Sequence, residues 1–400
     1  MIPTIANDFD QDCREAVLRL RGSLLNLYQS VGADPNKPQE VSRRFKLGKN
    51  LTWKIARIIQ AEDALAAVPL IPGAGGLTIL LDAMEGAGAD KDSVDRVQDA
   101  LRSFDEMIEV HVGDRAMLEL ILDSMGSSEE KPLAMSRKLA FRGNSGVWGV
   151  QAEVRVTAHF MAPSARGDRL DLALVGGFTQ VRRLRPIDRW PLFRVDSYHD
   201  DQTALGPEHG RIAIDPGAAS DPWLIDSFCT GAVPEIHIQP TGTALVYEAG
   251  NGPVGRTGEF DCFFGFFDRA AVPRYRDAVD ATGELVSSVS MPAKTLLFDL
   301  FVHRSLGEAM APRVGLIGHP ATGQMGAAGA SALPHGERLT NLGPATMVKT
   351  PLVPNYDALA GMVFERAGWN PKDFVCLRLV MPYPPMPATV KLVYDLPTKP

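Results

Sequence analysis

The stretch VQAEVRVTAHF, Val150–Phe160, decides the fold class of most of the chain. Apolar residues occupy every second position from Val150 to Phe160, and polar or charged residues fill most of the positions between them, from Gln151 to His159. A period of two is typical of a β-strand, because successive side chains point to opposite faces. We therefore predict a long strand with one buried face and one face in contact with water.

More segments with the character of strands follow this one, separated by loops rich in glycine and proline. They are RLDLALVG, RIAID, EIHIQ, TALVYEA, EFDCFFGFF, KTLLFDLFVH, VCLRLVM and ATVKLVYDL. One late helix is expected in NYDALAGMVFERAGW. Many short strands with few helices favour an antiparallel sandwich or a barrel-like arrangement over a doubly wound sheet. We expect residues 136–400 to form this β-rich domain, as one unit or as two subdomains.

The region before the β-rich segment has the period of a helix. Apolar residues recur at steps of three and four between Asp10 and Ser30, and again in DSVDRVQDALRSFDEMIEV after the capping candidate Asp90. DRAMLELILDSM closes the helical part, and GSSEEKP, Gly126–Pro132, has the composition of a linker. The sequence thus predicts an α+β protein, with a helical domain over 1–126 and a linker over 127–135.

Length and composition limit the class of protein. At 400 residues the chain exceeds what one hydrophobic core usually serves, and its 45% hydrophobic and 22% charged residues exclude wholesale disorder. The sequence shows no signal-peptide pattern and no long uncharged apolar run, so we expect a cytoplasmic protein without a membrane partner. The four cysteines, Cys13, Cys229, Cys262 and Cys376, lack the paired spacing of zinc or redox motifs. We interpret them as reduced, mostly buried thiols.

A basic patch interrupts this acidic chain. Between Pro35 and Gln60 there are seven basic residues and one acidic residue, a local charge of +6, whereas the whole chain carries −7 and the remainder therefore −13. Contacts to phosphate are made by a local surface, and exposed charges farther away than roughly 8–10 Å are largely screened. The patch can therefore attract a polyanion in spite of the acidic total.

The same patch has the apolar spacing of two short helices joined by a tight turn. The residues that would be buried are Val41, Phe45, Leu47, Leu51, Ile55 and Ile58 or Ile59, with Gly48 beside the turn. This spacing, over residues 39–60, resembles the helix-turn-helix superfamily of DNA-binding proteins. Two positions depart from the pattern, since Lys46 stands where a glycine is usual and Thr52 stands where an aliphatic residue is usual.

The resemblance implies that the second helix enters the major groove of double-stranded DNA. The side chains expected to read bases are Asn50, Thr52, Trp53 and Lys54. Those expected to hold phosphates are Arg43, Arg44, Lys46, Lys49 and Arg57. The alternative is a solvated basic face on an ordinary helical hairpin. We expect a homodimer, because symmetric DNA sites favour dimers.

These patterns predict a transcription regulator whose β-rich domain senses a small-molecule effector or mediates oligomerisation. Two alternatives stay open. The first is an enzyme with its active site near Asp196, His199 and Asp200 in DSYHDD, since carboxylates and imidazole suit acid–base or metal chemistry, although aspartates in loops are usually solvated turn formers. The second is a structural or assembly protein, in which the phenylalanines of EFDCFFGFFD form a contact instead of a sheet core.

Motif searches add no catalytic residue, no metal site and no cofactor. The glycine-rich IPGAGGLTILL follows a segment of helical character, which favours a helix-to-helix turn over a nucleotide loop. The stretch GHPATGQMGAAGASALPHGERL lacks the lysine of a phosphate loop and is expected to be a mobile loop.

Overall fold

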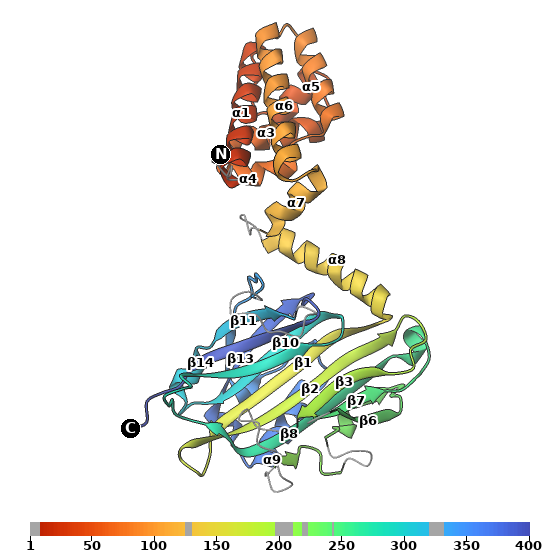
Figure 1. Ribbon diagram of the computed structural model, residues 1–400, viewed down its shortest axis with the longest axis vertical. Helices are drawn as coiled ribbons and strands as arrows, with labels where there is room; N and C mark the ends of the chain where they lie inside the picture. The colour runs from red at the N-terminus through yellow and green to blue at the C-terminus, as the bar shows by residue number, and fades with distance from the viewer. Residues whose placement is uncertain (1–8, 125–129, 197–210, 218–222, 242–243, 320–331) are drawn as a thin grey trace, which may run out of the picture. The chain divides into compact units, whose positions relative to one another are not determined.

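The computed structural model describes residues 9–124, 130–196, 211–217, 223–241, 244–319 and 332–400 (Figure 1). It confirms an α+β chain, with a helical region followed by a larger β-rich part. The chain divides into two compact units, Met1–Leu133 and Ala134–Pro400, here called the helical unit and the β-rich unit.

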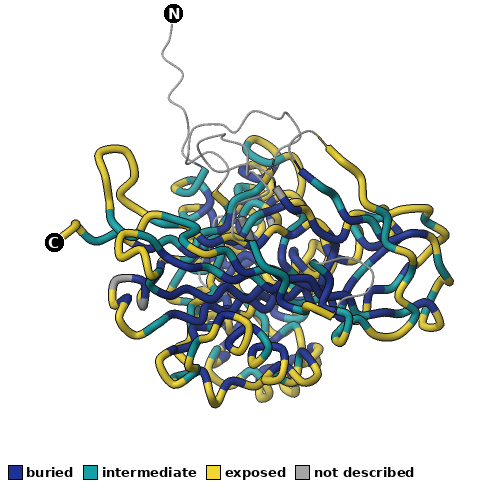
Figure 2. Tube along the Cα trace, turned by 90° about the horizontal axis from the view of Figure 1, so that it is seen from below, coloured by how far each residue is buried: buried dark blue, intermediate teal, exposed yellow. Residues whose placement is uncertain are grey.

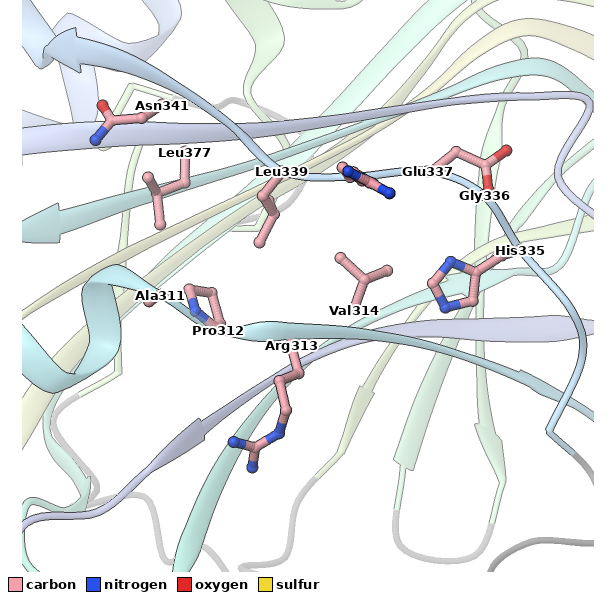
Figure 3. Close-up of a pocket in the computed structure, with 11 residues that line it drawn as sticks. Ala311, Pro312, Arg313, Val314, His335, Gly336, Glu337, Leu339, Asn341 and Leu377 are labelled. Carbon is pink, nitrogen blue, oxygen red and sulfur yellow. The ribbon is translucent and has the colours of Figure 1, made fainter. Parts of the chain in front are cut away.

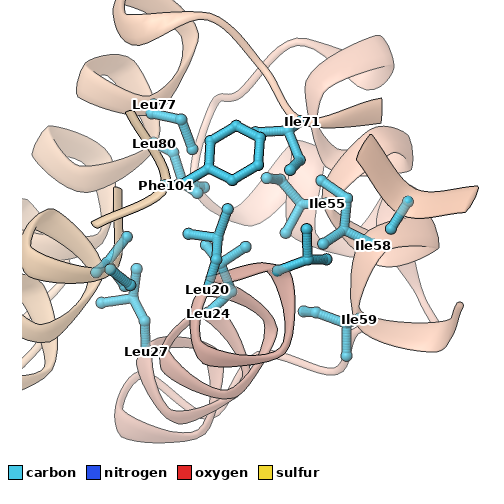
Figure 4. Packing of buried hydrophobic residues seen from close by; sticks show 14 of the residues in the cluster. Leu20, Leu24, Leu27, Ile55, Ile58, Ile59, Ile71, Leu77, Leu80 and Phe104 are labelled. Carbon is cyan, nitrogen blue, oxygen red and sulfur yellow. The ribbon is translucent and has the colours of Figure 1, made fainter. Parts of the chain in front are cut away.

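In the part of the chain that the structure describes, eight α-helices precede the first strand. They are α1 (Phe9–Ser30), α2 (Pro38–Arg44), α3 (Lys49–Gln60), α4 (Ala64–Ala67), α5 (Ala74–Gly86), α6 (Lys91–His111), α7 (Arg115–Ser124) and α8 (Glu130–Trp148). The expected stripes on α1 and α6 face a common core, which Figure 4 shows around Leu20, Leu24 and Phe104. The Asp90 side chain caps α6, accepting a hydrogen bond from the Ser93 amide at 2.7 Å. The segment expected to be a linker is helical from Glu130 onward.

Among the described residues, no single helix is long and apolar enough to cross a membrane. The bent pair Ala64–Leu70 and Ala74–Gly86 passes that test only when its two parts are taken together, and they meet at 92°. Leu65, Leu77 and Leu80 of this pair are buried in the core of the helical unit.

The described strands of the β-rich unit form three sheets. Their bounds are β1 (Val150–Pro163), β2 (Arg169–Arg183), β3 (Trp190–Asp196), β4 (Arg211–Ala213), β5 (Thr230–Gly231), β6 (Ile236–Thr241), β7 (Ala244–Ala249), β8 (Phe260–Pro273), β9 (Thr282–Val289), β10 (Ala293–His303), β11 (Arg313–Gly318), β12 (Thr340–Pro344), β13 (Phe374–Pro382) and β14 (Ala388–Asp395).

The large sheet has the order β12-β13-β10-β1-β2-β8-β4, with β5 also paired to β8 (Figure 1). The two smaller sheets have the orders β11-β14-β9 and β3-β7-β6. Among the described residues, all strand pairs are antiparallel except β1 with β10, which is parallel, so the expected antiparallel arrangement is interrupted at the centre of the large sheet. Figure 2 shows that buried residues, in dark blue, follow these central strands.

The two faces of β1 meet different partners. On one face, Val154, Val156 and Phe160 pack against the late helix α9 (Tyr356–Ala367). On the other face, Arg155, Thr157 and His159 are all buried, although the alternation predicted a wet face. The prediction of a strand with one face in water is therefore wrong, because the small sheet containing β9 covers that face.

We call the polar contacts between β1 and β9 the polar seam. Arg155 Nε donates to the Ser288 carbonyl at 3.3 Å, and the Thr157 and Ser287 hydroxyls lie 2.6 Å apart. His159 Nε2 donates to the Val286 carbonyl at 3.1 Å. Burial lowers the pKa of His159 to about 4, the Val286 carbonyl opposes this shift, and the Arg155 charge adds to it. The folded unit therefore holds His159 neutral.

A buried charge cluster fixes α9 to the sheet. The Asp299 carboxylate on β10 is fully buried and accepts bonds from Arg378 Nε at 2.8 Å and from Arg378 Nη2 at 2.7 Å. The Tyr356 hydroxyl, in the first turn of α9, donates to the same carboxylate at 2.7 Å. Burial raises the pKa of Tyr356 well above its usual range, and the Asp299 carboxylate raises it further, so the phenol stays a donor.

We predict that the stability of the β-rich unit falls as pH drops below about 6.5, because the unfolded chain then binds a proton at His159 that the folded chain takes up only near pH 4. Between pH 7 and pH 5 this linkage is worth roughly 2 kcal/mol. His159→Gln should therefore lose about 2 kcal/mol less than the wild type over this range. Urea unfolding followed by tryptophan fluorescence measures the difference, and equal losses in both proteins would contradict it.

We also predict that Asp299→Asn destabilises the β-rich unit by roughly 3–5 kcal/mol, because it leaves the Arg378 guanidinium buried without its counterion. Tyr356→Phe removes one hydrogen bond and should cost about 1–2 kcal/mol. The matched control is Asp395→Asn at the exposed pair with Arg313, which should change the unfolding midpoint little. Urea midpoints that shift equally in the Asp299 and Asp395 variants would refute a stabilising cluster.

Candidate functional site

The structure forms the two helices that the sequence placed in the basic patch. Helix α2 and helix α3 are joined by residues 45–48, and Val41, Phe45, Leu47 and Ile55 are buried as expected. The Ser42 hydroxyl closes the turn by donating to the Leu47 carbonyl at 2.7 Å. The local packing expected from the apolar spacing is therefore present.

The turn departs from the family pattern in an informative way. Lys46 has a φ of 54°, in the left-handed region that favours glycine, and Gly48 has a φ of −62°. Lys46 therefore adopts the backbone conformation for which the pattern uses a glycine, and Gly48 precedes α3 in an extended conformation.

Most of the nine residues expected to contact DNA are exposed, but two are engaged within the chain. Thr52 is 1% exposed and its hydroxyl donates to the Lys49 carbonyl at 3.1 Å, so it faces the core and cannot read a base. The Arg44 guanidinium donates to the Gly32 and Val31 carbonyls, each at 2.8 Å. Arg43, Lys46, Lys49, Asn50, Trp53, Lys54 and Arg57 have exposed or partly exposed side chains, and Arg57 lies over the Trp53 ring.

The acid–base site considered near DSYHDD lies almost entirely outside the described residues. Asp196 ends β3, and His199 and Asp200 fall in the range 197–210 that the structure does not describe. Among the described residues, no group of three or more His, Cys, Asp or Glu side chains is arranged to hold a metal ion. The phenylalanines of β8 are mainly core residues, with Phe260, Phe263 and Phe267 buried.

A pocket of about 660 Å³ lies within the β-rich unit, between the β11-β14-β9 sheet and the large sheet (Figure 3). Val314 from β11 and Leu377 from β13 form two of its walls. A third wall is the extended segment that leads into β12. This segment contributes His335, Gly336, Glu337, Arg338 and Leu339 to the lining. We call the space the His335–Glu337 pocket.

The wall segment alternates in burial as a strand does, but over residues 333–339 it belongs to none of the sheets that the described residues form. From Leu333 to Leu339 its residues alternate between partly buried and exposed, so that His335 and Glu337 share one side while Gly336 and Arg338 are exposed. Figure 3 shows the His335 ring facing Val314 across the pocket. Because side chains two residues apart lie on the same side of an extended segment, His335 and Glu337 both line the pocket.

An arginine from α8 holds this segment in place. The buried Arg137 guanidinium forms an ion pair with Glu337 through Oε1 and donates to the Pro334 carbonyl at 3.1 Å. The other carboxylate oxygen, Glu337 Oε2, and the ring atom His335 Nδ1 are buried and have no hydrogen-bond partner within the described part of the chain. Five other described side chains, of Tyr28, Thr179, Arg183, Trp190 and Arg274, also hold a buried polar atom without a partner, but His335 and Glu337 are the two of this group that line the pocket.

Sequence reasoning did not find this site. The composition predicts that PHGERL ends a mobile, glycine-rich loop, and residues 320–331 of that loop lie outside the described residues. The sequence held one weak signal of this site. Apolar Leu333 and Leu339 stand in the same alternating register as His335 and Glu337. That register predicts a strand with two polar residues turned inward.

The comparisons with known proteins assign no family. No family model and no curated protein matches the sequence. Among solved structures, the chain is similar to an M1 zinc metallopeptidase from Deinococcus radiodurans, at 9% identity and a TM-score of 0.24, and to a variant of it bound to a Tyr-Ser-Ala substrate, at 10% identity and a TM-score of 0.25. Each match covers 62% of this chain and 42% of the other, so the chain spans about two fifths of their length.

The prediction of a DNA-binding transcription regulator is corrected: the solved structures named above are metallopeptidases, and none of them is a transcription regulator. The burial of Thr52 also removes one of its expected base contacts. A TM-score of 0.25 is too low for the likeness to transfer peptidase chemistry to this chain. None of the eight histidines is followed four residues later by another, as the HExxH pattern of zinc metallopeptidases requires.

Proposed function

We propose that the β-rich unit is an enzyme that acts on a small polar molecule in the His335–Glu337 pocket. The observation that supports this proposal is the pair of buried, unpartnered atoms, Glu337 Oε2 and His335 Nδ1, on one side of one segment. A carboxylate oxygen accepts a proton, and an imidazole nitrogen accepts or donates one near neutral pH. Together they are a suitable pair for general acid–base catalysis.

The ion pair with Arg137 supports a catalytic role for Glu337. Arg137 engages Oε1, whereas Oε2 has no hydrogen-bond partner within the described part of the chain. The carboxylate is therefore held in one orientation, as positioning of a catalytic base requires. Arg137 acts here as a positioning residue, because its side chain bonds to the wall segment at both Glu337 and Pro334.

The lining limits the substrate class. A volume of about 660 Å³ fits a small molecule and falls within the usual range for ligand sites. Val314, Leu339 and Leu377 would pack against an apolar part of the ligand. A hydroxyl or amine group would satisfy Glu337 Oε2, and an anionic group at the rim would pair with Arg338. Arg313 contributes less, because its guanidinium binds Asp395 at 2.9 Å.

We predict that the full-length protein turns over a member of a panel of small chromogenic esters, amides, phosphoesters and glycosides, and that Glu337→Gln lowers kcat/KM by about 10²–10⁴. His335→Gln should lower it by a similar factor, because proton transfer needs both groups. Steady-state rates measured by absorbance test this expectation.

The matched control for the enzyme is Glu284→Gln, which changes a carboxylate on β9 that lies outside the pocket and pairs with Lys391. It should leave turnover unchanged. Turnover that is equal in the wild type and both pocket variants would place the chemistry elsewhere. If no panel compound reacts and ligand-observed NMR finds no fragment whose binding depends on Glu337, the proposal is wrong.

A further inference from the structure

The β-rich unit contains two cysteines on neighbouring strands, far from the His335–Glu337 pocket in sequence. Cys229 lies between the 3-10 turn Asp226–Phe228 and strand β5, and Cys262 lies on β8. The ladder pairs Thr230 with Asp261 and Gly231 with Phe260. Continued by one residue, this register places Cys229 directly opposite Cys262.

The position in the ladder suits a disulfide. Ala232 N donates to the Glu259 carbonyl at 3.0 Å, which marks a hydrogen-bonded position three residues away. Because such positions alternate in antiparallel pairs, Cys229 and Cys262 occupy a non-hydrogen-bonded position, where Cα atoms lie about 4.5 Å apart. Disulfides join Cα atoms separated by about 4.4–6.8 Å. Both thiols are free in this structure, and the Cys229 thiol lies 3.6 Å from the carbonyl oxygen of Phe263, the residue that follows Cys262.

The two thiols differ in reactivity. The hydrogen bond from Cys262 lowers the pKa of Cys229, and a bond from the Phe263 amide, whose nitrogen lies 3.4 Å from Cys229 Sγ, adds to this effect against the opposing burial. The same thiol–thiol bond, together with burial, raises the pKa of Cys262 well above its usual range. Cys229 is partly exposed, whereas Cys262 is 1% exposed. Cys229 is therefore the better nucleophile and the one that a solute can reach.

We propose that Cys229 and Cys262 form a peroxide-responsive thiol pair that closes to a cross-strand disulfide. The Cys229 thiolate attacks one oxygen of hydrogen peroxide, so that an S–O bond forms, the O–O bond breaks and, after protonation, one water leaves. The Cys262 thiol then attacks the sulfenic sulfur, an S–S bond forms, the S–O bond breaks and a second water leaves. Two thiols are oxidised to one disulfide, and one peroxide is reduced to two waters.

The other two cysteines are internal controls. Cys13 in the helical unit is buried, and burial raises its pKa to about 11, with the Asp10 charge adding to the shift. Cys376 on β13 is buried as well, and burial raises its pKa far above the usual range. Neither should react with peroxide in the folded protein.

The test is peptide mass spectrometry of the full-length protein after treatment with hydrogen peroxide and alkylation of the remaining thiols. The expected result is a crosslink between the peptides containing Cys229 and Cys262, with Cys13 and Cys376 alkylated only after unfolding. Absence of that crosslink, oxidation of Cys229 to the sulfinic acid without it, or crosslinks that include Cys13 or Cys376 would each overturn the proposal.

Two variants test the order of the steps. Cys262→Ser should stop the reaction at the sulfenic acid of Cys229, which dimedone labels, whereas Cys229→Ser should leave Cys262 unlabelled. Unfolding midpoints equal to that of the wild type show that the variants fold. Equal dimedone labelling of Cys262 in the Cys229→Ser variant and of Cys229 in the Cys262→Ser variant would show that Cys229 is not the more reactive thiol and would overturn the proposal.

Discussion

The hydrogen bonds between the polar face of β1 and strand β9 are the constraint on which the β-rich unit depends. Arg155, Thr157 and His159 are buried and each bonds to a residue of β9, while Arg155 also donates to the Val156 and Gly177 carbonyls of the large sheet. A buried polar group that loses its hydrogen-bond partner lowers the stability of the fold by about 1–3 kcal/mol. A shift of β9 by one residue would remove the partners of several such groups at once. The seam thereby sets the position of the small sheet on the large one, while the opposite face of β1 packs against α9.

This constraint also places the walls of the candidate site. Val314 reaches the pocket from β11, which belongs to the same small sheet as β9, and Leu377 reaches it from β13 of the large sheet. The separation of these walls therefore follows from how the two sheets are held together. Arg137 adds the third wall by binding Glu337 and Pro334. His335 and Glu337 differ from these fixed contacts, because each places a buried polar atom without a hydrogen-bond partner on the wall of the pocket, among the described residues.

Sequence patterns predicted the elements better than their partners. The helical stripe of α1 and the period of β1 follow from local geometry, so both elements form as expected. The alternation predicted that the polar face of β1 is in water, because water and a covering strand can both form hydrogen bonds with the same polar side chains. The strand that covers this face, β9, lies more than a hundred residues away in the sequence, so no local pattern reveals it. The burial of Thr52 was readable from its helical phase with Ile55 and Ile59. The meeting of Cys229 and Cys262, and of Glu337 with Arg137, depends on tertiary register that no local pattern contains.

The most direct test of the polar seam is the protonation state of His159, measured by ¹⁵N NMR on protein labelled at histidine and assigned with His159→Gln. The account predicts a neutral ring that carries its proton on Nε2, stays neutral until about pH 4 and exchanges this proton slowly, because Nε2 donates to the buried Val286 carbonyl. An imidazole that titrates near 6.5 with no protected proton would show that β9 does not cover β1, and would contradict the account.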